Sequence, residues 1–154
     1  MDVNRVQLGQ PAIPAHMRLM EARVTLEVQN AMLAAQRRTD AELEHMLHVV
    51  RCMRRKLTNL NAYIDLDLDL HLRIARATHN LMLVQLLDTI RPDMRAVMYD
   101  GLSRCWTIQQ REHIQGVHEA LIEQIGHRDA DAAGKLMRLH FSEAIVRLGG
   151  ALAP

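Results

Sequence analysis

Three histidines of this chain lie within otherwise apolar helical stripes, and one of them follows an aspartate by four residues. These residues are His71 with Asp67, His118 and His140. A side chain on such a stripe points into the core, where an unpaired polar group costs roughly 1–3 kcal/mol and an unpaired carboxylate costs more. One divalent metal ion bound by three imidazoles and a carboxylate would satisfy all four side chains. The pattern therefore predicts a metal site.

The segments that would position these residues are predicted to be helical. Thr39-Asp40-Ala41-Glu42 has the form of a capping box, Asp129 is a suitable N-cap, and Pro92 is well placed to open a helix. Together with the apolar periodicity, these signals predict helices over residues 16–38, 39–60, 64–77, 80–91, 92–109, 111–125 and 129–149. The fold class that follows is all-α.

Residues 64–72 are the exception to a simple helical pattern. Ile64-Asp65-Leu66-Asp67-Leu68-Asp69-Leu70-His71-Leu72 alternates strictly between apolar and polar residues, which is typical of a strand. As a helix, the same segment brings Asp67 and His71 together at i, i+4 and turns Asp69 away. We favour the helix because the neighbouring segments are helical and no partner strand is evident, although periodicity alone leaves both open.

Length and composition narrow the class of protein. A chain of 154 residues is most simply one domain, and we expect residues 1–15, with two prolines, to be a tail or linker before a domain at 16–150. The formal net charge of +1 gives no overall electrostatic reason to bind nucleic acid or anionic membrane. Two cysteines, no signal peptide and no long apolar run predict a soluble, cytoplasmic protein.

Several short motifs occur in an order that is specific as a set. They are Glu21-Ala-Arg23-x-x-Leu26-Glu27, Leu33-Ala34-Ala35, Thr39, Asp67-x-x-x-His71, Ala77-Thr78-His79-Asn80, His118-x-x-Leu121-Ile122 and Arg128-Asp129-Ala130-x-x-Ala133 followed by His140. In this order the chain resembles the FCD domain, the ligand-sensing domain of the FadR subfamily of GntR-type bacterial transcription regulators. The resemblance covers about residues 16–148, and Leu70 replaces a phenylalanine that is usual in the family.

The resemblance implies an antiparallel bundle of six to seven helices around a central metal and ligand cavity. In the metal-binding branch of the family, one aspartate and three histidines hold a divalent ion, and these positions fall on Asp67, His71, His118 and His140. We expect zinc first, with nickel and manganese as alternatives, because the ligand types do not decide among them.

The family's effectors are mostly small organic acids, so two further residues become candidates for effector binding. Arg23 matches the arginine of the first-helix motif and could direct its guanidinium at a carboxylate; alternatively, it forms an i, i+4 salt bridge with Glu27 on the helix surface. Asn80 matches the family's asparagine and could line the pocket, although it already has a structural role as a helix N-cap.

Other polar clusters are better explained as solvated surface. His45, His48 and Cys52 share a helix face with Arg38, and the run Arg51, Arg54, Arg55 and Lys56 is basic. We expect neither set to form a site.

The predicted function is effector binding by a transcription regulator, with no catalysis. The resemblance also implies a homodimer, and DNA contact only through a winged helix-turn-helix domain that is not found in these residues. Two alternatives stay open: a helical metalloenzyme acting on a small carboxylate, and a metal-free helical interaction module.

Overall fold

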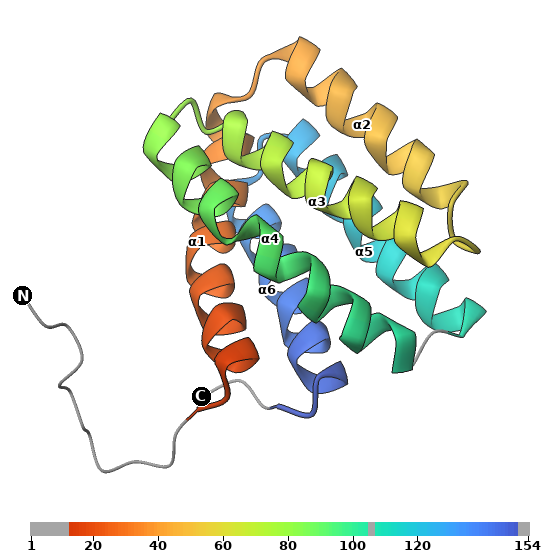
Figure 1. The fold of residues 1–154 in the computed structure, drawn as a ribbon. Helices are drawn as coiled ribbons and strands as arrows, with labels where there is room; N and C mark the ends of the chain where they lie inside the picture. The colour runs from red at the N-terminus through yellow and green to blue at the C-terminus, as the bar shows by residue number, and fades with distance from the viewer. Residues whose placement is uncertain (1–12, 105–106, 151–154) are drawn as a thin grey trace, which may run out of the picture.

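The computed structural model of the chain describes residues 13–104 and 107–150 (Figure 1). These residues form six α-helices and contain no strand, so the all-α prediction is confirmed. The helices are α1 (Ala15–Arg37), α2 (Asp40–Arg54), α3 (Leu60–Arg76), α4 (Leu81–Arg104), α5 (Ile108–Gly126) and α6 (Ala130–Arg147). Most of the tail predicted at 1–15 lies outside the described residues.

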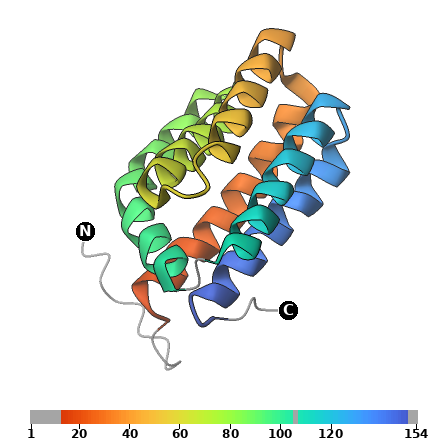
Figure 2. The same cartoon turned by 90° about the vertical axis from the view of Figure 1, so that its right-hand side faces the viewer.

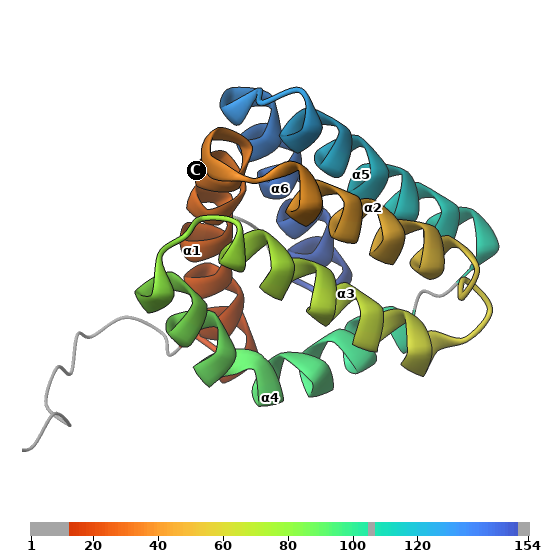
Figure 3. The same cartoon turned by 90° about the horizontal axis from the view of Figure 1, so that it is seen from above.

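The six helices contact one another in a closed cycle. Going round the molecule, α1 packs on α6, α6 on α5, α5 on α2, α2 on α3, α3 on α4, and α4 again on α1. The view from above in Figure 3 follows this order, and Figure 2 shows the neighbouring helices running side by side. Side chains that point inward from α1, α3, α5 and α6 therefore converge on one interior.

Helix boundaries follow capping residues, some of which are recognisable in the sequence. Thr39 and Glu42 form the predicted capping box at the start of α2, and Asp129 caps α6 by accepting a hydrogen bond from the Ala132 N–H. The predicted boundary between the second and third helices is wrong. α2 ends at Arg54, and α3 begins at Leu60 because Asn59 accepts a hydrogen bond from the Ala62 N–H and supplies an N-cap.

The predicted helix break at Pro92 is also wrong. Pro92 lies inside α4, which continues from Leu81 to Arg104, so the described helices number six. A proline inside a helix removes one backbone hydrogen bond and bends the helix. Figures 1 and 3 show α4 changing direction along its length. The bend keeps both halves of α4 packed on the bundle, with Leu87 buried before the proline and Met94 after it.

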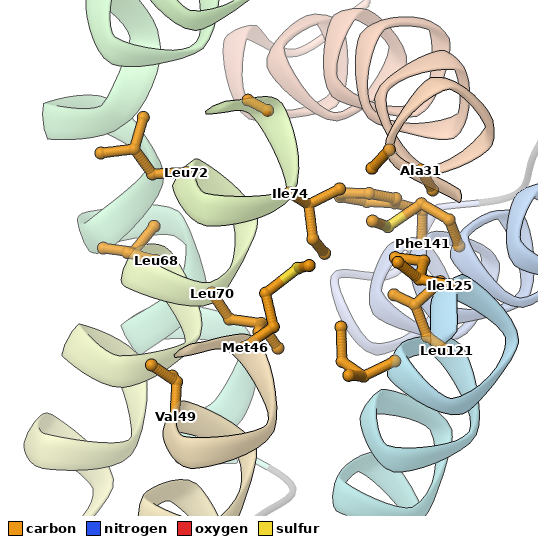
Figure 4. Close-up of a cluster of buried hydrophobic side chains, with 14 of the residues drawn as sticks. Ala31, Met46, Val49, Leu68, Leu70, Leu72, Ile74, Leu121, Ile125 and Phe141 are labelled. Atoms are coloured by element: carbon orange, nitrogen blue, oxygen red, sulfur yellow. The ribbon is translucent and has the colours of Figure 1, made fainter. Parts of the chain in front are cut away.

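The alternating segment 64–72 is helical, as favoured. α3 lies between α2 and α4 and also faces the interior, so Leu68, Leu70 and Leu72 are all buried although they do not share one helix face. Figure 4 shows Leu70 and Ile74 among core side chains, with Leu68 and Leu72 on the side toward α4. Burial on several faces explains why a helix carries a strand-like pattern.

The remaining core comes from all six helices. Its largest fully buried side chains include Tyr63, Phe141, Met46, Leu121 and Ile74, several of which Figure 4 places together at the centre. Across residues 13–104 and 107–150, none of the helices is both long and apolar enough to cross a membrane.

Candidate metal and effector site

The structure brings the four predicted ligands together. Asp67 and His71 come from α3, His118 from α5 and His140 from α6, and all four side chains are buried. One possible ligand atom from each lies within 4.8 Å of those of the other three. Residues up to 73 positions apart therefore share one site, because α3, α5 and α6 all face the interior of the bundle.

The atoms that face one another across this site lack hydrogen-bond partners. Nε2 of His71, Nε2 of His118 and Oδ2 of Asp67 are buried and have no such partner among the described residues. Nε2 of His118 lies 2.7 Å from Oδ1 of Asp67, but the contact does not have the geometry of a hydrogen bond. Three orphaned buried atoms of metal-ligating type in one place are unusual, since buried polar atoms are normally satisfied.

The far side of the His71 ring is held by a residue from α1. Nδ1 of His71 contacts Oε2 of Glu27, and Oε1 of Glu27 accepts a hydrogen bond of 2.8 Å from Nε of Arg23. A histidine whose Nδ1–H donates a hydrogen bond to a carboxylate keeps Nε2 as the atom available for ligation. α1 thus orients a ligand that α3 carries.

The far side of the His118 ring is also occupied. Nδ1 of His118 lies 3.3 Å from the hydroxyl of Tyr63, and that hydroxyl donates to Oε1 of Gln115 at 3.2 Å. Both Tyr63 and Gln115 are fully buried. His71 and His118 therefore each present Nε2 to the cluster and Nδ1 to a polar neighbour.

Electrostatics in the cluster favour a charged carboxylate at Asp67 and an uncharged imidazole at His140. Burial would raise the pKa of Asp67, but His118 and His71 outweigh burial and hold the pKa below its ordinary value. Burial, reinforced by His118 and His71, lowers the pKa of His140 well below 6.5. Asp67 is thus an anion and His140 a neutral imidazole near pH 7, which is the form in which each binds a metal ion.

The pKa values of Glu27 and His71 are both shifted in the direction that favours the charged form of each side chain. Burial would lower the pKa of His71, but the negative charges of Glu27 and Asp67 outweigh burial and raise it. Burial would raise the pKa of Glu27, but Arg23 and His71 outweigh burial and lower it. In the absence of a metal ion, a proton on His71 balances these two carboxylates.

A cavity adjoins the cluster. Its lining includes Asp67, His140, Arg23 and Tyr63, and the C-terminal half of α4 closes one side with Val97, Met98, Gly101 and Leu102. The space for water-sized molecules is about 40 Å³. A single water molecule needs only about 10–15 Å³ of such space. The cavity therefore accepts water but must widen to accept a larger molecule.

The two predicted effector-binding residues have different surroundings. Arg23 forms the i, i+4 pair with Glu27, but the pair is buried rather than on the surface, and Arg23 also lines the cavity. Its Nη2 is buried without a hydrogen-bond partner among the described residues. Asn80 is exposed and accepts a hydrogen bond from the Met82 N–H; it does not line the cavity, so its placement supports the capping role.

Other polar residues of α2 and α3 lie apart from the cluster. Asp65 and Asp69 pair with Arg95 and Arg73 on the outside of α3. On α2, His45 and His48 are exposed, and Cys52, which is half-buried, contacts His48 at 3.5 Å.

Three residues around the site were not identified from the sequence as part of it. The helical spacing indicates Glu27 only as a surface partner of Arg23, and it gives Tyr63 and Gln115 no role. The available signals were positional: Tyr63 precedes Asp67 by four residues and Gln115 precedes His118 by three, so each shares a helix face with a ligand.

The family model of the FCD domain matches residues 18–143 of the chain. The chain belongs to the FCD domain family. This match spans all four cluster residues and most of the six helices, and it confirms the family suggested by the sequence motifs. An FCD domain is the ligand-sensing regulatory part of GntR-type regulators, and the chain is a domain of this kind.

Curated relatives extend beyond the FCD domain. A candidate L-lactate dehydrogenase operon regulatory protein of Escherichia coli (strain K12) is 28% identical over 126 residues, which are 80% of this chain and 48% of the relative. A protein of the same description from Shigella flexneri matches to the same extent. The FCD domain described here thus spans about half the length of these relatives.

Solved structures share the fold of this FCD domain. Streptococcus agalactiae GntR superposes with a TM-score of 0.72 at 23% identity, covering 88% of this chain and 59% of that one. E. coli McbR/YncC superposes with a TM-score of 0.77 at 12% identity, covering 90% of this chain and 71% of that one. At these identities the likeness is one of fold.

Proposed function

We propose that this FCD domain senses a small organic acid through a divalent metal ion held by Asp67, His71, His118 and His140. The observation that carries the proposal is the set of orphaned atoms in the cluster. Nε2 of His71, Nε2 of His118 and Oδ2 of Asp67 are buried and unsatisfied, a state that costs roughly 1–3 kcal/mol per group and that a bound cation would relieve.

The spacing within the cluster supports a metal ion rather than a simple ion pair. Zn–N and Zn–O bonds are about 2.0–2.2 Å long, so two ligand atoms at right angles on one ion lie about 3 Å apart. Nε2 of His118 and Oδ1 of Asp67 are separated by 2.7 Å without the alignment of a hydrogen bond. Such a misaligned close contact fits two adjacent ligands of one ion. Zinc is the first candidate, with nickel and manganese as alternatives.

The proposed effector site lies where the cluster meets the cavity. Three histidines and one carboxylate leave positions open on a five- or six-coordinate ion, and Asp67 and His140 line the cavity. Arg23 lines the same cavity with an unsatisfied Nη2, which could donate to a carboxylate. The metal ion would supply a fixed positive charge, and Arg23 would orient the acid.

The relatives indicate which acid to test first. The name of the E. coli and S. flexneri proteins refers to an L-lactate dehydrogenase operon, and lactate is a small hydroxy acid that could place both a carboxylate and a hydroxyl oxygen on one metal ion. L-lactate is therefore the first member of a panel of small hydroxy acids and sugar acids.

Effector binding would be transmitted through the helices that close the cavity. Because the space is only about 40 Å³, an acid larger than water must displace a wall, and the C-terminal half of α4 is the wall with most of its residues exposed. A ligand shifts such an equilibrium only by its differential affinity for the two arrangements. We propose that a DNA-binding domain, in a homodimeric regulator located in the cytoplasm, responds to this shift.

The test is a thermal-shift and calorimetric screen of the zinc-loaded protein against the acid panel, with metal-free protein beside it. The proposal expects at least one acid to raise the melting temperature of the loaded protein and to leave the metal-free protein unchanged. Equal shifts in both forms would show that the acid does not use the metal ion. No shift from any acid in the panel would contradict the proposed effector class.

A further inference from the structure

A hydrogen-bond chain continues from His118 to the outside of the bundle. The Tyr63 hydroxyl lies 3.3 Å from Nδ1 of His118 and 3.2 Å from Oε1 of Gln115. The amide nitrogen of Gln115 lies 3.0 Å from the backbone oxygen of Val50 and 3.0 Å from Oε1 of Glu119. The chain thus joins α3, α5 and α2 behind one proposed metal ligand.

The donors and acceptors in this chain can be arranged in one direction only. Both neighbours of the Gln115 nitrogen, the Val50 carbonyl and the Glu119 carboxylate, are acceptors, so the two N–H groups of the amide are used there. Turning the amide over would set its oxygen against both of these acceptors. Oε1 of Gln115 must therefore face Tyr63 and accept its hydroxyl proton.

The direction of the chain determines the tautomer of His118. A hydroxyl has one proton to donate, and that of Tyr63 is directed to Gln115. Toward His118 the hydroxyl can only accept, so Nδ1 of His118 carries a proton and donates it. In the neutral imidazole, Nε2 then carries a lone pair. This atom lies 2.7 Å from Oδ1 of Asp67, so two acceptors face each other in the cluster, an arrangement that a bound cation would satisfy.

We infer that Gln115, acting through Tyr63, is a positioning residue that holds His118 in the Nδ1–H tautomer and so keeps Nε2 available as a metal ligand. The role of this tautomer in metal binding rests on the proposed function. The tautomer itself follows only from hydrogen bonds within the protein. Groups of this kind typically contribute ten- to hundredfold to metal affinity.

The outer end of the chain anchors the Gln115 amide. Glu119 accepts two hydrogen bonds from Arg54, at 2.5 and 2.6 Å, at the surface between α5 and α2. This pair holds the carboxylate that receives one of the Gln115 N–H groups. The backbone oxygen of Val50 receives the other, so the amide keeps one fixed acceptor if the surface pair is broken.

The variant that tests this inference is Gln115→Met. Methionine fills a similar volume and has no strong acceptor, so the Tyr63 hydroxyl is free to donate to Nδ1 of His118. The ring proton then moves to Nε2, where it blocks ligation. Tyr63→Phe is a second variant, which removes the hydroxyl and leaves His118 without its orienting partner. Tyr99→Phe is the matched control, because Tyr99 is the exposed tyrosine of α4.

The readout is long-range ¹⁵N imidazole NMR of the metal-free protein at pH 8, with His118 assigned by comparison with His118→Gln. We expect the Nδ1–H tautomer in the wild type and Tyr99→Phe, the Nε2–H tautomer in Gln115→Met, and a mixture in Tyr63→Phe. Zinc affinity, measured by competition with a chelator, should fall ten- to hundredfold in Gln115→Met and stay unchanged in Tyr99→Phe.

An Nε2–H tautomer in the wild type, or the same tautomer in the wild type and both site variants, would overturn the inference. The NMR measurement uses metal-free protein, so it decides the tautomer even if the wild type binds no metal. Failure of the proposed metal site and failure of this inference are therefore distinguishable.

Discussion

Glu27 of α1 contacts Nδ1 of His71 of α3, and both side chains are buried. The two residues are 44 positions apart, and their contact makes the first helix part of the proposed site although it carries none of the four ligands. Arg23, one turn before Glu27, completes a buried group of three charged or chargeable side chains. A change in α1 should therefore alter metal binding.

Glu27→Gln should weaken metal binding without removing a ligand. The amide oxygen can still accept a hydrogen bond from Nδ1–H of His71, but the negative charge of the carboxylate, which raises the basicity of the ring, is lost. We expect zinc affinity to fall ten- to hundredfold, as measured by chelator competition. Glu21→Gln is the control, because Glu21 is exposed on the same helix. Equal affinities in wild type and Glu27→Gln would mean that α1 does not tune the site.

Arg23→Lys should separate effector binding from metal binding. Lysine keeps the positive charge beside Glu27 but loses the planar fork that could hold a carboxylate. For whichever acid proves active in the screen, we expect affinity to fall at least about tenfold, or about 1.4 kcal/mol, while zinc affinity changes less. Arg18→Lys, on the exposed face of α1, serves as control. Unchanged acid affinity in Arg23→Lys would remove Arg23 from the effector site.

The pH dependence of stability should differ in sign between two of the histidines. The folded state lowers the pKa of His140, so the unfolded chain binds its proton first and the protein loses stability as pH falls below 6.5. The folded state raises the pKa of His71, so its stabilising contribution is complete below 6.5 and is lost as pH rises through the folded pKa.

Urea unfolding of metal-free protein between pH 5.5 and 8 tests these signs against His140→Gln and His71→Gln. Relative to His140→Gln, the wild type should become less stable toward acid. Relative to His71→Gln, it should become less stable toward alkali. If the stability difference between the wild type and each of the two variants changed with pH in the same direction, the pKa shifts assigned to His140 and His71 would be contradicted.

Pro92→Ala should stabilise α4. Pro92 is exposed and interrupts the backbone hydrogen bonds of a helix that continues on both sides. Restoring the missing N–H should raise the free energy of unfolding by about 1–3 kcal/mol, measured as a higher urea midpoint with unchanged slope. Asp93→Ala, at the next exposed position, provides the control. A lower midpoint would show that the bend at Pro92 is needed for packing.

The sequence was sufficient to predict the helical class and the four residues of the cluster. His118 and His140 were recognisable because each interrupts an apolar stripe, and a stripe reports burial. Asp67 was recognisable because i, i+4 spacing places it beside His71. These signals are local, and in the structure the four side chains lie together; metal binding by them stays a prediction.

Other features depend on contacts between helices and could not be predicted in the same way. The continuity of α4 through Pro92 depends on how both halves pack, which outweighs the tendency of proline to end a helix. Glu27 and Gln115 look like ordinary polar helix residues, and only the contacts of α1 with α3 and of α5 with α2 make them part of the site. The start of α3 at Leu60 is not evident from the sequence. Asn59, the N-cap of α3, lies in a polar stretch where several residues could end or begin a helix.

The number of metal ions bound per chain decides whether the four buried side chains form a metal site. The wild type, His118→Ala, His140→Ala and the exposed control His113→Ala would be purified without a metal-affinity step, reconstituted with zinc, nickel or manganese, and subjected to elemental analysis. We expect one ion per chain in the wild type and His113→Ala, and loss of that ion in both cluster variants. No bound ion after reconstitution with any of the three metals, or an ion retained in both cluster variants, would contradict it.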